Sequence, residues 1–90
     1  MTETREIRLK RLKIRSWRRG TKEMDMLLGP FADGALPDLA EPDLAAYEAM
    51  LEENDQDLYA WVSGRDRPTA AHAGLIARIA AWHDIPPPAP

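Results

Sequence analysis

The ten residues Ser16–Asp25, with the sequence SWRRGTKEMD, decide how this 90-residue chain is organised. They place a tryptophan and two arginines before a single glycine, and basic and acidic side chains after it. Glycine adopts backbone conformations that other residues avoid, so Gly20 predicts a joint between two helices. Thr21 then stands at an N-cap position, and acidic residues follow in the first turn, where the helix dipole favours them.

A helix is predicted before this joint, over residues 5–17, because the segment contains no proline or glycine and mixes aliphatic with basic side chains. Its apolar residues do not form one stripe. They fall on two sides, which is typical of a helix wedged between two neighbours or of a helix broken before Trp17. One side holds Ile7, Ile14 and Trp17, and the other holds Leu9 and Leu12.

The helix after the joint has the clearest apolar face in the chain. Gly29-Pro30 is expected to kink or split this helix, because proline lacks an amide donor and its ring conflicts with the preceding turn. Residues 32–40, which contain Gly34 and Pro37, are interpreted as a connection. The apolar face consists of Met24, Leu27, Leu28 and Phe31.

Three more helices are predicted in the remaining chain. The third begins near Pro42, the fourth is capped by Asp55 and ended by Gly64, and the fifth is capped by Thr69. The fold class is therefore all-α, a small bundle of about five short helices. The inward-facing residues are expected to be Leu44, Tyr47, Met50 and Leu51 of the third helix, Leu58, Trp61 and Val62 of the fourth, and His72, Leu75, Ile76, Ile79 and Trp82 of the fifth.

The domain organisation follows from length and composition. Ninety residues suit one small domain, which we place at residues 1–84. Residues 85–90 contain four prolines and are expected to form a disordered tail. There is no apolar run of the roughly 20 residues that a membrane-spanning helix needs, so no membrane insertion is expected. The absence of cysteine excludes disulfides and thiolate metal sites.

Charge is divided sharply along the chain. Residues 1–22 carry nine Lys/Arg and two Glu, for a net charge of +7, while the other 68 residues carry −10. Such asymmetry indicates a partner-binding end. One interpretation is a small nucleic-acid-binding or regulatory helical domain that uses residues 5–22. The acidic remainder of the chain, with a sequence pI near 5.3, argues against nucleic acid.

No enzyme chemistry is evident. The two histidines, His72 and His83, lie eleven residues apart on one predicted helix and cannot share a metal ion without further ligands. No serine has a histidine and acid arranged around it, and no glycine pattern fits a phosphate loop. We therefore expect no catalytic residue, no metal site and no enzyme activity. From the residues alone, the joint is either an ordinary helix junction or a docking spot for another protein.

Two motifs resemble those of a known family. Arg19–Glu23 reads RGTKE and resembles RGxxE, and Asp55–Trp61 reads DQDLYAW and resembles DxDLxxW. Both are similar to motifs of the succinate dehydrogenase assembly factor family, also called the FAD assembly or flavinylation factors. The resemblance extends from about Leu9 to Pro68. It does not include the predicted C-terminal helix or the proline-rich tail.

The resemblance implies a five-helix bundle that binds the flavoprotein subunit of succinate dehydrogenase, and often of fumarate reductase, and promotes covalent attachment of FAD to it. It implies no cofactor of its own, since the FAD belongs to the partner. The mitochondrial branch carries a presequence, whereas the basic helix begins here almost at once, so a bacterial cytoplasmic location is expected.

The resemblance also places the partner-binding site at the joint. Gly20 would allow close backbone contact with the partner. Arg19 would pair with a partner carboxylate or carbonyl, and Glu23 would make a reciprocal contact or fix Arg19. The flanking residues of this site would be Trp17, Arg18 and Asp25.

Overall fold

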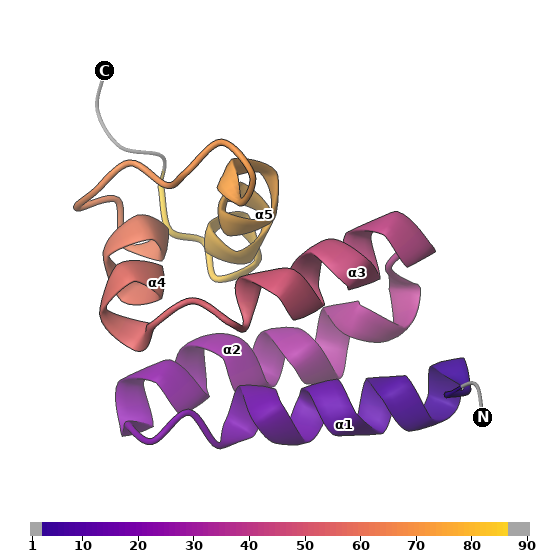
Figure 1. Ribbon diagram of the computed structural model, residues 1–90. Helices are drawn as coiled ribbons and strands as arrows, with labels where there is room; N and C mark the ends of the chain where they lie inside the picture. Colours follow the sequence, from indigo (N-terminus) through magenta and orange to yellow (C-terminus); the bar gives the residue numbers. More distant parts are fainter. Residues whose placement is uncertain (1–2, 87–90) are drawn as a thin grey trace. The chain divides into compact units, whose positions relative to one another are not determined.

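The protein is described by a computed structural model that covers residues 3–86. This part of the chain is helical and contains no strand, so the all-α prediction is confirmed (Figure 1). The chain divides into two compact units, Met1–Ala40 and Glu41–Pro90, which we call unit 1 and unit 2. The helices are α1 (Arg5–Trp17), α2 (Lys22–Ala35), the short 3-10 helix η1 (Leu36–Asp38), α3 (Glu41–Met50), α4 (Asp55–Val62) and α5 (Ala73–Trp82).

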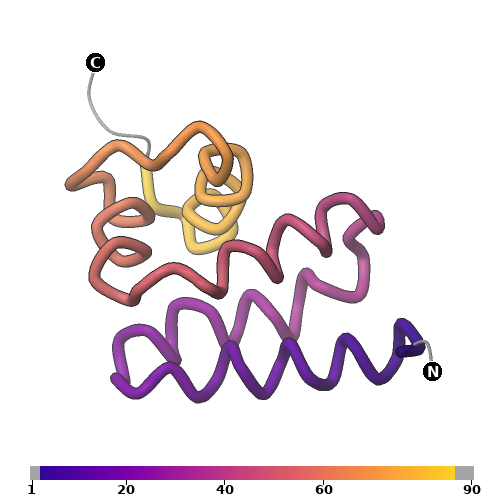
Figure 2. The backbone as a smooth tube through the Cα atoms, viewed as in Figure 1, coloured from indigo at the N-terminus to yellow at the C-terminus, as the bar shows by residue number. Residues whose placement is uncertain are grey.

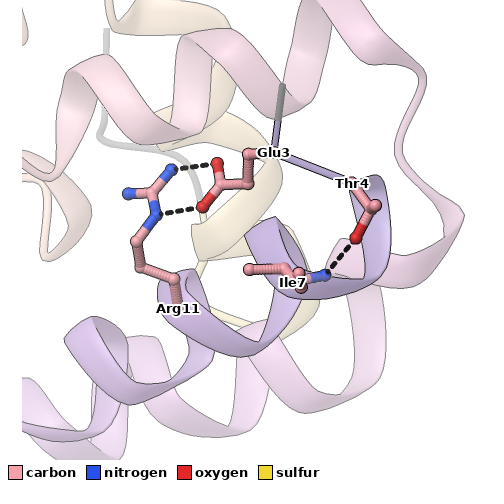
Figure 3. Close-up of polar contacts among 4 residues, drawn as sticks. All are labelled: Glu3, Thr4, Ile7 and Arg11. Atoms are coloured by element: carbon pink, nitrogen blue, oxygen red, sulfur yellow. Dashed lines mark hydrogen bonds and ion pairs between the residues drawn. The ribbon is translucent and has the colours of Figure 1, made fainter. Parts of the chain in front are cut away.

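The start of α1 is held by polar contacts of three side chains (Figure 3). The Thr4 hydroxyl accepts a hydrogen bond from the Ile7 amide at 3.1 Å and caps the helix. The Arg11 guanidinium donates to both carboxylate oxygens of Glu3, at 2.8 and 2.9 Å. These hydrogen bonds to Arg11 hold the pKa of Glu3 below its usual range. The bounds predicted for this helix, residues 5–17, are confirmed.

Only one side of α1 is buried. Leu12 and Ser16 are fully buried, and the Ser16 hydroxyl donates to the Leu12 carbonyl at 2.8 Å. On the other side, Ile7 and Ile14 are 56% and 55% exposed. The expectation of a helix wedged between two neighbours is therefore wrong, and so is the break before Trp17. The sequence shows two apolar sides, but it cannot show that only one of them has a neighbour to cover it.

Helix α2 packs along α1 within unit 1. It begins where expected, because the Thr21 hydroxyl accepts from the Met24 amide at 3.3 Å. Pro30 does not split it, and helical structure continues to Ala35 and into η1, so the predicted connection over residues 32–40 is wrong in its first half. Burial on both sides of the proline explains the continuity, since packing stabilises helices more than propensity does. The buried residues around it are Leu28, Phe31 and Ala32.

Arg5 links the beginning of unit 1 to its end. Its guanidinium donates to the Leu39 carbonyl at 2.6 Å and to the Pro37 carbonyl at 3.3 Å. Both carbonyls lie at or just after η1, more than 30 residues further along the chain. One cationic side chain of the basic segment is therefore used inside the fold.

Unit 2 contains α3, α4 and α5. The cap of α4 is Asn54 rather than Asp55: the Asn54 side chain accepts from the Asp57 amide at 2.9 Å, and Asp55 is the first helical residue. Both residue types cap well, so composition alone could not choose between neighbours. Gly64 has a φ of +82° just beyond α4 and ends the helix as predicted.

Helix α5 begins later than predicted. Its first residue is Ala73, after a turn in which the His72 amide donates to the Thr69 carbonyl, so Thr69 does not cap it. Trp82 is 44% exposed, against the prediction that it faces inward, and Trp61 is half-buried. The remaining predicted core residues of unit 2, apart from the half-buried His72, are buried: Leu44, Tyr47, Met50, Leu51, Leu58, Val62, Leu75, Ile76 and Ile79.

The end of the described chain is tied back to α5, since the Ile85 amide donates to the Ala80 carbonyl at 2.9 Å. Residues 87–90 of the predicted tail lie outside the described residues, and the single domain over residues 1–84 stays a prediction. None of the described helices is long and apolar enough to cross a membrane.

Candidate functional site

The joint between α1 and α2 is a tight reversal of the chain (Figure 2). Helix α1 ends at Trp17, and Gly20 has a φ of +104°, a conformation that L side chains rarely adopt. A Cβ atom at Gly20 would meet nothing within 4 Å. Glycine is thus required here by the backbone, and the space in front of it is open.

Asp25 of α2 and Thr21 at the N-cap of this helix fix the joint. The Asp25 carboxylate accepts a hydrogen bond from the Arg19 amide at 2.7 Å. The Thr21 carbonyl accepts from the Asp25 amide at 3.0 Å, while the Thr21 side chain caps the helix. The first turn of α2 therefore holds the backbone on both sides of Gly20, at Arg19 and at Thr21, and this fixes the conformation of Gly20.

Trp17 is fixed by the second half of α2. Its indole Nε1–H donates to the Asp33 carboxylate at 3.1 Å. The indole ring lies directly on Gly29, so closely that a Cβ there would overlap the ring atoms. Gly29 is therefore a seat for the ring. Trp17 remains 37% exposed, so part of its ring faces solvent while these contacts fix its orientation.

A shallow open hollow of about 540 Å³ lies beside this tryptophan. The basic side chains at its edge are Arg18 and Lys22, and both are exposed. The hollow combines an aromatic ring, positive charge and bare backbone, which suits contact with a protein surface rather than chemistry on a small molecule. Its lining residues are Trp17, Arg18, Gly20, Thr21, Lys22, Asp25 and Met26.

Four of the six predicted site residues meet at this hollow: Trp17, Arg18, Gly20 and Asp25. The other two do not line it. Arg19 is half-buried beside it, with its amide bound to Asp25, and Glu23 is exposed on α2.

The residues that sequence reasoning missed are Gly29 and Asp33, which hold Trp17. Gly29 stands twelve residues from Trp17 in the chain, and together with Pro30 it predicts a kink or a split of the helix instead. A glycine inside a helical pattern can also mark a close approach, and that was the available signal.

The described part of the chain has no group of three His, Cys, Asp or Glu side chains that could hold a metal ion. The nearest approach to such chemistry is a pair in unit 2, where His72 Nε2 lies 3.1 Å from a Glu53 carboxylate oxygen. The imidazole also lies against the Trp61 ring, with centroids 5.9 Å apart. This half-buried pair links His72, the residue before α5, to the turn that follows α3, and no third ligand joins it among the described residues.

Comparison with known proteins agrees with the two motifs. The family model described as "Flavinator of succinate dehydrogenase" matches residues 10–83. A FAD assembly factor SdhE from Pseudomonas aeruginosa is 39% identical over 74 residues, which cover 82% of this chain and 87% of that protein. One from Aliivibrio fischeri is 38% identical over 63 residues, covering 69% of this chain and 73% of that protein. A mitochondrial succinate dehydrogenase assembly factor 2 from Meyerozyma guilliermondii is 41% identical over 61 residues, covering 68% of this chain but 45% of that protein.

The fold defines a small all-α protein, and the hollow at the joint between α1 and α2 suits contact with a protein partner. The match over most of the chain makes the identification more specific. The chain belongs to the family of succinate dehydrogenase flavinators, whose bacterial members in this comparison are FAD assembly factors. The match reaches residue 83 and so includes α5, whereas the resemblance read from the sequence stopped at Pro68.

Proposed function

We propose that this protein binds the flavoprotein subunit of succinate dehydrogenase through the joint between α1 and α2 and promotes covalent attachment of FAD to that subunit. The role as an assembly factor for flavinylation follows from the family. The place of contact is supported by one observation above all: Gly20, held in a glycine conformation, has open space in front of it.

The proposed mechanism is a shift of population in the flavoprotein. Covalent coupling requires the flavin and a histidine of the flavoprotein to be held at bonding approach, and such positioning can remove several kcal/mol, roughly 7–11 at the extreme, from a barrier. The factor would bind the arrangement of the flavoprotein that is ready for coupling more tightly than its other arrangements. The population of that arrangement then rises, at most by the ratio of the factor's affinities for the two states. The linkage chemistry then belongs to the flavin and the flavoprotein.

Several further expectations belong to this proposal. The protein acts without enzyme activity and without a cofactor of its own, and it serves the fumarate reductase flavoprotein as a second client. It works in the bacterial cytoplasm, where a chain without cysteine suits a reducing environment. Nucleic acid is not a partner. Arg5 and Arg11 of the basic helix bind groups within unit 1, so fewer positive charges are left to contact the phosphates of a nucleic acid.

The test is complementation of a strain that lacks the gene, with covalent flavin measured by fluorescence of the denatured flavoprotein subunit. Arg18→Ala and Glu23→Ala remove exposed side chains at the joint, and both are expected to lower covalent flavin severalfold while the free variant remains folded. Arg67→Ala and Asp66→Ala are the matched controls, since they remove exposed side chains of the same charge in unit 2. Normal flavinylation with both joint variants would refute this contact site.

A further inference from the structure

Helix α1 carries an apolar stripe that remains uncovered. Ile7, Ile14 and Trp17, which we call the outer stripe, are 56%, 55% and 37% exposed. At about 3.6 residues per turn, positions spaced by seven and three residues fall within one arc of a helix, here roughly opposite the buried Leu12 and Ser16. The outer stripe spans about 15 Å along the helix axis.

Positive charge borders this stripe. Lys10 is exposed on the same arc of α1, where its ammonium lies 3.9 Å from the exposed Glu6 carboxylate. Arg18 is exposed directly after the end of the helix. Lys10 and Arg18 belong to the segment of residues 1–22, whose net charge is +7. An apolar strip with a cationic border is complementary to an apolar patch that is bordered by carboxylates.

The stripe ends in a side chain that is already fixed. The Trp17 ring rests on Gly29, and its Nε1–H is bound to Asp33. An aromatic side chain that loses little freedom on association is a favourable interface anchor. Trp17 also lines the hollow at Gly20, so the stripe and the joint form one continuous surface.

We infer that the outer stripe of α1 is a second part of the docking surface, and that it binds an apolar patch bordered by carboxylates on the flavoprotein client. This inference rests on the proposed function. It extends the contact from the joint along α1 as far as Ile7, with Trp17 as the anchor shared by both parts.

Two other occupants fit the stripe less well. A second copy of the chain, facing the first through a two-fold axis, would bring two segments of charge +7 together. A lipid surface would have to take up Trp17 together with the Asp33 carboxylate bound to it, and moving a carboxylate into an apolar medium is costly. A protein surface can accept both groups at its polar rim.

The test uses the double variant Ile7→Ser/Ile14→Ser and the purified flavoprotein subunit of succinate dehydrogenase. Dissociation constants are measured by biolayer interferometry, and circular dichroism checks that the variant is folded. We expect binding to weaken by about 10- to 100-fold, because two apolar contacts beside an anchor are lost. Tyr59→Ser, which removes a 40% exposed aromatic side chain of unit 2, is the control and should leave binding unchanged.

A second variant tests the charged border and does not depend on apolar packing. Lys10→Glu should slow association at low salt and reduce its salt dependence, because border charges act mainly on the association rate. Arg67→Glu changes the net charge equally in unit 2 and should have a smaller effect. Equal effects of the two variants would mean that only the net charge of the protein matters. That result would overturn the inference that carboxylates border the apolar patch on the client.

The outcomes separate this inference from the proposed function. Unchanged affinity of the Ile7→Ser/Ile14→Ser variant, with weakened binding of Arg18→Ala, would overturn the stripe and leave the joint in place. No binding of the wild type to the flavoprotein would overturn the proposed function itself. Sedimentation with phosphatidylglycerol vesicles, or a dimer in light scattering, that is lost in the double variant while flavoprotein affinity stays unchanged would assign the stripe to lipid or to a second copy.

Discussion

At the scale of single residues, two helical glycines with different surroundings provide a direct comparison. Gly29 lies under the Trp17 ring, whereas a Cβ at Gly74 of α5 would meet nothing within 4 Å. Gly29→Ala should lower the free energy of unfolding by about 1–3 kcal/mol through overpacking, which exceeds its gain in helix propensity. Gly74→Ala should raise it by about 0.5–1 kcal/mol. Urea denaturation measures both.

The informative result is that the two variants change the free energy of unfolding in opposite directions. If both alanine variants were stabilised alike, the indole would have moved away from Gly29 without cost. In that event the Trp17 Nε1–H resonance in an NMR spectrum would shift, because the hydrogen bond to Asp33 would be lost. An unshifted resonance together with a more stable protein would contradict the seat described for this ring.

The ion pair at the start of α1 predicts a dependence on pH. Its hydrogen bonds lower the pKa of Glu3 in the folded state, so their contribution is complete above the usual glutamate pKa, around pH 4. It is lost as the pH falls through the lowered value. An NMR titration of the Glu3 carboxyl should show this low midpoint, and Arg11→Ala should return it toward the usual range. An unchanged midpoint in that variant would exclude Arg11 as the cause.

At the scale of elements, Pro30 in the interior of α2 should weaken a helix that tertiary packing maintains. Pro30→Ala restores an amide donor and removes the ring conflict, which is worth up to about 3 kcal/mol. The greater freedom of the unfolded chain offsets about 0.4–1 kcal/mol of this gain. We expect a net increase in the free energy of unfolding of roughly 1–2 kcal/mol, measured by urea denaturation.

Pro42→Ala is the matched control, because Pro42 is the second residue of α3, where the amide has no partner within the helix. Its effect should be within about 1 kcal/mol of zero or slightly destabilising. A loss of stability in Pro30→Ala of the same size as in Pro42→Ala would show that the interior proline does not strain α2.

Local features of the sequence predicted the elements best. The joint at Gly20 and the end of α4 at Gly64 are predicted correctly, because tolerance of a positive φ is a property of glycine itself. The course of α2 through Pro30 was not, because burial of residues on both sides of the proline decides it. The RGxxE motif predicted a candidate site at the joint. The support of Trp17 by Gly29 and Asp33 depends on the packing of α2 along α1, and its one local signal is a glycine inside a helical pattern.

At the scale of the whole molecule, the predicted single domain over residues 1–84 can be tested by native-state hydrogen exchange. If the chain unfolds in one step, the slowest amides of unit 1, such as that of Leu28, and of unit 2, such as that of Ile79, should exchange with the same free energy and the same dependence on denaturant. Two separate values would show that Met1–Ala40 and Glu41–Pro90 unfold independently.

The half-exposed Trp17 also makes this protein an optical reporter of its own proposed task. Indole emission overlaps the absorption of oxidised flavin, so excitation energy would pass from this residue to a nearby FAD and its emission would fall. An apoprotein client would instead shelter the ring from water and move the emission to shorter wavelength. A Trp61→Phe/Trp82→Phe variant, which keeps Trp17 as its single indole, could thus reveal whether the factor arrives before the cofactor or after it.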